Sequence, residues 1–499
     1  MVPPLAGVLV YADPPSPALP DIIGTNSVTV SMGSSASANA TAIDNAVFDV
    51  GSAAGGGGTV IIPSGTWNCN PLAFNIGNVD LEVEGNLVAP TNATLPNWGG
   101  STAFITWSNA KNSELVSLDG SYIDGEGGIG TNDWYANPGA ARPALVSFSN
   151  PQTFLVQGLT FYNSPQQFFT FGGSKTNDIT FNQIFINAPG TSPNTNGIDP
   201  DGNNFLITNS TIEDGDDNIA IQASGSDSPS TNIAITNLTI GTGHGISVGS
   251  GTTLGVNNVY VNNITFNGTI YGFRLKTEAN NGGLVQNLSF NNVSMTNVFY
   301  PVYISSWYNG SGFSYPRNAA SAARFNSVTN SGFTSGVTPQ WENLTFNNIT
   351  SGWTSTTATG YTNSIAGLLY GLPASVISNV NFNNVTLSAY QGMSLAYAGT
   401  NADPISFTGN WAINAATGQT FGTFTSPNNT TSGTGNPGNL LYWNGTSSTG
   451  GTFSTWETSN VVVLSVPEPT TASLAVASSA LMLMRRRRNS SATADQKTG

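Results

Sequence analysis

Charged side chains are scarce in this 499-residue chain. They make up 8% of it, and lysine and arginine together number 12 against 26 acidic residues. The formal net charge of −14 argues against nucleic-acid binding, because such proteins present a positive surface to the phosphates. Beyond that, an acidic balance indicates little more than solubility.

Cysteine and histidine occur once each, as Cys69 and His244. A single cysteine excludes an intramolecular disulfide, and such a residue most often serves as a small buried apolar side chain. Clustered cysteine and histidine, the usual zinc ligands, are missing. The sequence therefore points to no metal and no cofactor.

Long segments of good helix formers are rare as well. β-Branched and aromatic residues recur in short runs between glycines and asparagines, which is typical of an all-β protein. Residues 38–50 are the exception, because Ile43, Val47 and Val50 would share one face of a helix. A short strand follows at Thr59–Ile62, so we expect this helix to cap the open end of a stack of strands.

From about residue 70 the chain repeats a unit in which asparagines separate alternating apolar residues. Copies begin at Asn177, Asn204, Asn232, Asn258, Asn287, Asn343 and Asn379. The first intervals are 27, 28, 26 and 29 residues, and the next one, 56 residues, would be about two periods. Such a period indicates a solenoid or a propeller.

Each unit can hold two or three short strands with asparagine at the bends. Asparagine tolerates the left-handed conformation, and stacked asparagines can form side-chain ladders. We therefore predict an all-β fold, a right-handed single-stranded parallel β-helix with an N-terminal capping helix. A propeller is the alternative, but it needs about 40–50 residues and four antiparallel strands per blade.

Composition divides the chain into four parts. Residues 1–25 form a leader without the basic region of a signal peptide. Residues 26–400 form the β-helix domain, and residues 401–460, rich in Gly, Thr, Ser and Asn, form irregular final coils or a linker. Residues 461–499 form a distinctive tail.

Within the tail, Val466-Pro467-Glu468-Pro469 precedes an apolar run from Ala472 to Met484, and four arginines follow at 485–488. The run is shorter than the ~20 residues of a membrane span. The tail resembles the PEP-CTERM sorting signal of Gram-negative bacteria. The resemblance implies export to the cell surface or medium, transient insertion of the tail in the inner membrane, and an exosortase-type enzyme that removes it.

Four short motifs lie close together in the repeat region. They are Asn194-Thr195-Asn196-Gly197-Ile198-Asp199, Asp214-Gly215-Asp216-Asp217, Gly243-His244-Gly245 and Arg274-Leu275-Lys276. A lone Gly-Asp-Asp is more often a turn, and clustered aspartates can also bind calcium. Glycoside hydrolysis, however, needs two carboxyl groups in different protonation states, and repulsion between neighbours raises the pKa of one.

The spacing of these motifs matches the coil. His244 lies 28 residues after Asp216, and Arg274 lies 30 residues after His244, so stacking would align all three. Asp216 and Asp217 need a bend to face the same bond, because adjacent side chains on a regular strand point to opposite faces. Arg274 and Lys276 share one strand face, where a guanidinium and an ammonium together suit a sugar carboxylate.

In this order and spacing, the motifs resemble those of glycoside hydrolase family 28, the polygalacturonase-like pectinases. The family patterns are Asn-Thr-Asp, Gly-Asp-Asp, Gly-His-Gly and Arg-(Ile/Leu)-Lys, and the resemblance covers roughly residues 26–400. It implies a parallel β-helix that hydrolyses α-1,4-galacturonosyl bonds with inversion. It also implies a monomer whose partner is an acidic polysaccharide such as pectin or galacturonan.

The resemblance gives each residue a role. Asp216 would be the general acid, Asp217 would activate water, and His244 would support the acid or bind sugar. Two further roles concern the substrate. The galacturonate carboxylate would bind Arg274 and Lys276, and Tyr308 would contact the sugar.

One position departs from the family pattern. Asn196 stands where the family has a third catalytic aspartate, and an amide cannot act as a base. Asp217 can suffice while Asn196 positions the water, Asp199 can take over the lost role, or the chain binds sugar without cleaving it. We favour the first reading. The alternatives are a hydrolase of rhamnogalacturonan or another uronic-acid polymer, and a non-catalytic surface β-helix that binds polysaccharide.

Overall fold

The computed structural model describes most of the chain between residues 14 and 415, together with two later strands. The described residues are 14–308, 338–415, 440–443 and 463–466, without 23, 54–55, 129–132, 137–140, 226–227, 279–281, 353–363, 373–374, 390, 397, 400–402 and 404. Residues 1–13, most of the segment 401–460 and the tail from 467 lie outside this part. The leader, the linker and the sorting signal therefore stay predictions.

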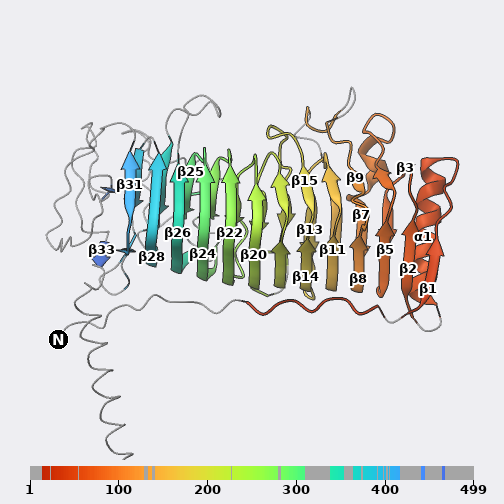
Figure 1. Cartoon of the computed structure of the whole chain (residues 1–499), viewed down its shortest axis with the longest axis horizontal. Coiled ribbons are helices and arrows are strands. Elements are labelled where there is room, and N and C mark those ends of the chain that lie inside the picture. The colour runs from red at the N-terminus through yellow and green to blue at the C-terminus, as the bar shows by residue number, and fades with distance from the viewer. Residues whose placement is uncertain are drawn as a thin grey trace, which may run out of the picture.

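Three rows of strands run the length of the molecule, and each full turn of the chain adds a strand to each row (Figure 1). All pairings between named strands in the described part are parallel, which rules out the antiparallel blades of a propeller. The predicted parallel β-helix is therefore confirmed. In later coils the first two rows merge into continuous strands, such as β22 with 12 residues.

The first row holds β1 (Asn26–Thr29), β2 (Gly58–Ile62), β5 (Val79–Val83), β8 (Lys111–Val116), β11 (Gln152–Gln157), β14 (Asn177–Asn182), β17 (Asn203–Thr208), β30 (Ile405–Thr408) and β33 (Val463–Val466). The second row holds β3 (Thr66–Asn68), β6 (Asn86–Val88), β9 (Tyr122–Asp124), β12 (Thr160–Tyr162), β15 (Phe185–Asn187), β18 (Thr211–Glu213) and β31 (Ala412–Ala415). The strands that cross both rows are β20 (Ser230–Ile240), β22 (Val256–Asn267), β24 (Leu284–Thr296), β26 (Gln340–Gly352) and β28 (Ser378–Ala389).

The third row is a separate sheet. It holds β4 (Leu72–Phe74), β7 (Ala103–Ser108), β10 (Ala144–Ser149), β13 (Phe169–Gly172), β16 (Ile198–Asp199), β19 (Ile219–Ile221), β21 (Ile246–Val248), β23 (Tyr271–Lys276), β25 (Tyr300–Ser305), β27 (Ile365–Tyr370), β29 (Gln391–Ala396) and β32 (Leu440–Trp443). A short 3₁₀ helix, η1 (Pro96–Gly100), precedes β7.

Helix α1 (Ala36–Ser52) covers the N-terminal end of the stack (Figure 1). Ser35 caps it, since its side-chain oxygen accepts a hydrogen bond from the amide of Ala38 at 3.1 Å. Ile43, Val47 and Val50 are buried against the first coil, as their spacing predicts. The predicted cap is confirmed, and it shields apolar side chains that the first coil would otherwise expose.

The core fills the inside of the coil with identical residue types stacked in register. Phe290, Phe346, Phe382 and Phe407 occupy one column, and their rings stack at centroid distances of 4.9, 4.8 and 5.0 Å. Alternate residues point outward, so the inside is mostly apolar, with Ser113 as a buried polar residue in the column of Phe154 and Ile179. Cys69 is buried there, which agrees with the expected packing role.

Asparagines at the coil corners form the predicted ladders. Asn209, Asn237 and Asn263 all have positive φ, and each donates its side-chain amide to the asparagine one coil earlier, as in the 2.8 Å bond from Asn263 to Asn237. Asparagine tolerates the left-handed backbone conformation at the corner, and its side chain forms a hydrogen bond with the asparagine of the neighbouring coil. These two properties explain why asparagine recurs at this period.

One prediction about the repeat is wrong. The interval of 56 residues between Asn287 and Asn343 was expected to contain about two coils, but β24 pairs directly with β26, and the amide of Asn343 donates to Asn287 at 3.1 Å. That interval is one coil with a long connection, which periodicity alone does not distinguish from two short ones.

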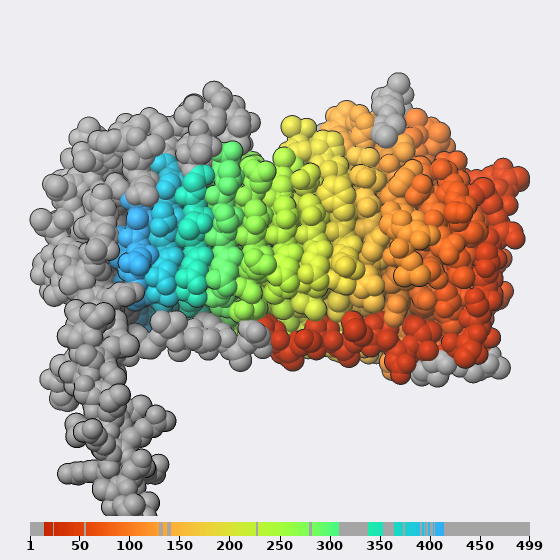
Figure 2. All heavy atoms as spheres, viewed as in Figure 1, coloured from red at the N-terminus to blue at the C-terminus, as the bar shows by residue number. Residues whose placement is uncertain are grey.

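Residues 14–22 lie extended along the lower edge of the stack (Figure 2). The amide of Ala18 donates to Asp178 at 3.3 Å, and the amide of Asp21 donates to Asn112 at 2.5 Å, so the segment crosses several coils. No helix in the described residues is long and apolar enough to span a membrane. The apolar run in the tail is outside those residues.

Candidate active site

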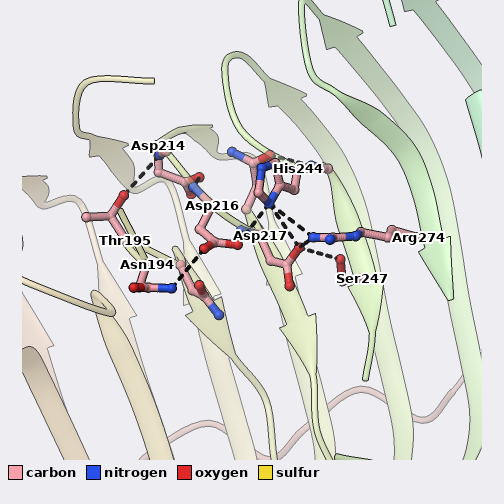
Figure 3. Close-up of polar contacts among 12 residues, drawn as sticks. Asn194, Thr195, Asp214, Asp216, Asp217, His244, Ser247 and Arg274 are labelled. Atoms are coloured by element: carbon pink, nitrogen blue, oxygen red, sulfur yellow. Dashed lines mark hydrogen bonds and ion pairs between the residues drawn. The ribbon is translucent and has the colours of Figure 1, made fainter. Parts of the chain in front are cut away.

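The four motifs converge on consecutive strands of the third row. The first motif leads into β16, the aspartate pair precedes β19, His244 precedes β21, and Arg274 and Lys276 lie on β23 (Figure 3). The backbone amide of His244 donates to the carbonyl of Asp216 at 2.6 Å, so the two loops are joined as neighbouring rungs. The alignment predicted from spacings of 28 and 30 residues is therefore present.

Asp217 is a buried carboxylate held by three donors from later coils. Oδ1 accepts from Arg274 at 2.7 Å and from Ser247 at 2.7 Å, while Oδ2 accepts from Lys276 at 2.5 Å. The residue is 3% exposed. Burial alone would raise the pKa of this carboxyl, but the charges of Lys276 and Arg274 outweigh burial and hold that pKa well below its usual range. Asp217 is therefore ionised.

The two cations are as deeply placed as their partner. Arg274 is 8% exposed and Lys276 is 4% exposed. The guanidinium carbon of Arg274 lies 4.4 Å from the ring centroid of Tyr271, and the ammonium of Lys276 lies 4.8 Å from that of Tyr308. These aromatic faces stabilise cations that have left bulk water.

Asp216 faces more open space than its neighbour, with 20% of its side chain exposed against 4% for Asp217. Its Oδ1 lies 2.9 Å from Nδ1 of His244 and accepts the amide of Asp217 at 3.0 Å. Its Oδ2 accepts from the amide of Asn194 at 3.3 Å. Burial raises the pKa of Asp216, yet the hydrogen bond with His244 and the nearby cations set a net pKa below the ordinary value.

Nδ1 of His244 has a second neighbour, Nη1 of Arg274, at 3.0 Å. When Nδ1 carries a proton it donates to Asp216, whose carboxyl is then ionised. A guanidinium can only donate, so when Nδ1 accepts from Arg274 the imidazole carries its proton on Nε2. Oδ1 of Asp216 and Nδ1 of His244 are therefore within hydrogen-bond distance in either tautomer of the imidazole.

Asn196 and Asp199 contact each other within one strand end. The Asn196 amide nitrogen lies 3.0 Å and 3.3 Å from the two oxygens of Asp199. Burial raises the pKa of Asp199 to about 8, so this carboxyl is neutral at the pH where Asp217 is ionised. The position that carries an aspartate in the family pattern therefore holds an amide that is oriented by a buried carboxylic acid.

The flanking glycines are required by close packing between the loops. The buried Asn218 donates to the carbonyl of Thr242 at 2.7 Å and accepts from the amide of Gly245 at 2.8 Å, which ties the aspartate loop to the histidine loop. A Cβ on Gly243 would lie 2.6 Å from the side chains of Asn218 and Asp214, and its φ is +125°. A larger residue there would push the loops apart.

Metal binding is disfavoured at this site. Ligand atoms of Asp216, Asp217 and His244 lie within 4.8 Å of one another, which is the geometry of a possible ion site. However, Arg274 and Lys276 already neutralise Asp217, and a divalent cation would be repelled by both. The donor set therefore suits proton transfer better than a metal.

The structure brings together five residues that the motifs single out, namely Asp216, Asp217, His244, Arg274 and Lys276. Tyr308 lies beside Lys276, while Asn196 and Asp199 form their own pair. The motifs did not indicate a role for Ser247, Tyr271 or Arg142. Ser247 could have been found from its register with Arg274, since both point outward on neighbouring strands.

The sequence profile of glycosyl hydrolases family 28 matches residues 57–394. Among individual proteins, a probable polygalacturonase from Arabidopsis thaliana is 34% identical over 282 residues, or 54% of this chain and 58% of that protein. An endo-polygalacturonase from Pectobacterium carotovorum subsp. carotovorum is 35% identical over 225 residues, 42% of this chain and 55% of that one. The chain thus spans little more than half the length of these two relatives.

An exopolygalacturonase from Platanus acerifolia is 30% identical over 351 residues, covering 68% of this chain and 83% of that protein. Among solved structures, a polygalacturonase from Erwinia carotovora ssp. carotovora superposes with a TM-score of 0.56 at 25% identity, covering 75% of this chain and 94% of the other. A hyperthermoactive exopolygalacturonase from Thermotoga maritima, 17% identical with a TM-score of 0.58 over 78% and 94%, shares the fold.

Proposed function

The chain belongs to glycosyl hydrolases family 28, and from that premise we propose that it is an exported polygalacturonase-type hydrolase of pectic polysaccharide. It would cleave α-1,4-galacturonosyl bonds with inversion. The observation that carries this proposal is the contrast between two adjacent carboxyls. Asp217 is buried and held by two cations, whereas Asp216 is more exposed and lies within hydrogen-bond distance of His244.

Asp216 acts as the general acid. In the free site its pKa is low because His244 and the cations stabilise the carboxylate. A galacturonan brings negative charge to the site, and like charge nearby favours the protonated carboxyl. Asp216 therefore takes up a proton as substrate binds, ready for transfer to the leaving oxygen.

Asp217 accepts a proton from the attacking water. The three donors to its oxygens stabilise the anion in the resting site and leave it poorly suited to attack the sugar itself, which favours water as the nucleophile. Asp216 and Asp217 have atoms within 4.8 Å, closer than the ~6.5–9.5 Å usual for inverting pairs. The anomer of the first product is thus an informative measurement.

Arg274 and Lys276 also hold the substrate carboxylate. Both are drawn out of bulk water by Asp217 and by the rings of Tyr271 and Tyr308, and a desolvated cation attracts a second anion strongly. A galacturonate carboxylate that binds Arg274 and Lys276 would weaken their contacts with Asp217. Asp217 would then become a stronger base.

The test is a reducing-sugar assay on polygalacturonate with the wild type and Asp216→Asn. We expect release of reducing ends by the wild type and a loss of roughly 10²–10⁴-fold in the variant. Proton NMR on the first minutes of reaction should show the β-anomer, opposite to the α-bond cleaved. The α-anomer as first product would refute inversion.

Asn196 favours a second candidate, a surface protein that binds acidic polysaccharide without cleaving it. Background release from both proteins on polygalacturonate and on rhamnogalacturonan, with retained binding of galacturonate oligomers, would establish that candidate. Activity on rhamnogalacturonan alone would assign the hydrolase to that polymer.

A further inference from the structure

Arg142 lies outside the four motifs but connects to them. It lies two residues before β10 and is 6% exposed. Nη1 donates to the carbonyl oxygens of Pro165, at 3.0 Å, and of Pro193, and Nη2 donates to Oδ1 of Asn194 at 2.6 Å. A buried guanidinium thus fixes both the backbone and the side chain of the loop that enters the site.

Asn194 passes this contact on to the acid. Because its Oδ1 accepts from Arg142, its Nδ2 must point the other way, and it donates to Oδ2 of Asp216 at 3.3 Å (Figure 3). Asn194 also has a φ of +58°, a conformation in which asparagine is among the few tolerated residues. The amide therefore has one orientation, set by Arg142.

The two oxygens of Asp216 are consequently in different environments. Oδ1 is occupied by His244 and by the amide of Asp217, whereas Oδ2 has the longer bond to Asn194, whose own side chain is exposed. Oδ2 therefore has the weaker contact and is the oxygen that would deliver a proton to a bound sugar. A donor that is polarised by a cation stabilises the charge left on Oδ2 when that proton departs.

We propose that Arg142 is a positioning residue for the general acid, which acts through the Asn194 amide on Oδ2 of Asp216. The proposal rests on the proposed function for its role in turnover. Arg142 orients the carboxyl of Asp216 and makes it a stronger acid, although Arg142 touches neither the substrate nor the reacting atoms.

Several charges act on Asp216, and only one of them is changed by the test. The titratable and charged groups around it are Asp217, His244, Arg274, Lys276, Arg142, Asp199 and Asp214. Loss of the Arg142 cation, or of the Asn194 donor, destabilises the ionised form of Asp216. Its pKa then rises, and the mean titration midpoint of the coupled Asp216–His244 pair rises with it.

The experiment compares Arg142→Met, Asn194→Gly, the double variant and a control, Lys111→Met; glycine removes the amide donor and tolerates the φ of +58° at this position. Lys111 is an exposed lysine on β8, so its replacement removes the same charge away from the site. Activity on polygalacturonate is followed from pH 4 to 9. The imidazole of His244 is titrated by NMR in protein prepared without a histidine tag, where the single histidine gives an unambiguous signal.

We expect Arg142→Met and Asn194→Gly each to lower kcat roughly 10-fold with little change in KM. Each should also move the alkaline limb of kcat/KM, and the His244 midpoint, upward by roughly half a pH unit. The double variant should match the single variants, because both remove one connected path. Arg142→Lys should reverse part of this upward shift, since lysine keeps the positive charge but lacks the two-pronged hydrogen-bonding geometry of the guanidinium.

Two results would overturn the proposal. One is a pH profile and a His244 midpoint that match those of Lys111→Met. The other is additive losses in the double variant. If Arg142→Met fails to fold by circular dichroism, Asn194→Gly, which changes an exposed side chain and tolerates the positive φ, decides alone. If the wild type is inactive, the proposed function fails, but the His244 midpoint still tests the connection from Arg142 to Asp216.

Discussion

The ammonium of Lys276 lies 2.5 Å from Oδ2 of Asp217, although 59 positions separate the two residues. The contact spans two rungs, from the loop before β19 across β21 to β23. Strands are about 4.8 Å apart, so only a long side chain covers this distance. The rung between carries Ser247, which is short enough to leave room and polar enough to donate.

Replacing Lys276 should shift the acidic limb of activity. In Lys276→Met, Asp217 loses its Oδ2 partner, and its pKa rises toward the ordinary value. Asp217 would then take up a proton at higher pH, where it can no longer activate water. We expect the acidic limb of kcat/KM to move up by roughly one unit. Lys175→Met, at an exposed lysine, is the control and should leave the limb in place.

Asn196→Asp tests how the chain works with an amide at this position. The introduced carboxylate would lie about 3 Å from Asp199, whose raised pKa keeps it neutral and able to donate to the new anion. A second base near the water should raise kcat roughly 3- to 10-fold at pH 5. A fall in kcat with normal stability would mean that the amide of Asn196 itself is required.

Asp199 should make the fold less stable as the pH rises. Its pKa is about 8 in the fold and about 3.9 in an unfolded chain. Its contribution is fully present below pH 4 and is lost between about pH 4 and pH 8, because the unfolded state releases the proton first. We expect Asp199→Asn to show a smaller drop in melting temperature from pH 5 to pH 8. Parallel curves for the two proteins would contradict the shifted pKa.

The contribution of Asp217 to stability depends on pH in the opposite direction, since the fold lowers the pKa of this carboxyl. Its contribution is present above about pH 4 and is lost as the pH falls below that value. The melting temperature of the wild type should therefore be highest near pH 4 to 5, where both contributions are largely intact.

The contribution of a ladder asparagine to stability can be divided into a conformational part and a hydrogen-bonding part. Asn237 combines a φ of +57° with bonds to Asn209 and Asn263. Asn237→Gly removes the bonds but tolerates the backbone, whereas Asn237→Ala also strains it. We expect Asn237→Ala to cost about 1–2 kcal/mol and Asn237→Gly to cost less. Equal losses would mean that the backbone conformation carries no cost.

Much of the fold could be predicted because the same local sequence pattern recurs in many coils. Asparagine at each bend and apolar residues between bends fix both the corner and the inward face. The interval between Asn287 and Asn343 could not be resolved, since a long connection and an extra coil have the same length in sequence. The pairing of β24 with β26 decides between them.

The site was less completely predictable. Residues one coil apart could be aligned by counting, which places His244 over Asp216. Counting does not indicate which anion a cation meets, and Arg274, expected at a sugar carboxylate, binds Asp217 in the free site. The role of Arg142 depends on the rotation of one amide group, which no spacing encodes.

The clamp around Asp217 joins three consecutive coils through side chains alone. If the coils at these rungs separate transiently, Asp217 loses Ser247, Arg274 and Lys276 together. Catalysis would then stop before the molecule as a whole unravels. Turnover measured during gentle heating therefore reports on the local stability of the three coils in the middle of the solenoid. It should be lost at a lower temperature than the one at which the backbone as a whole unfolds.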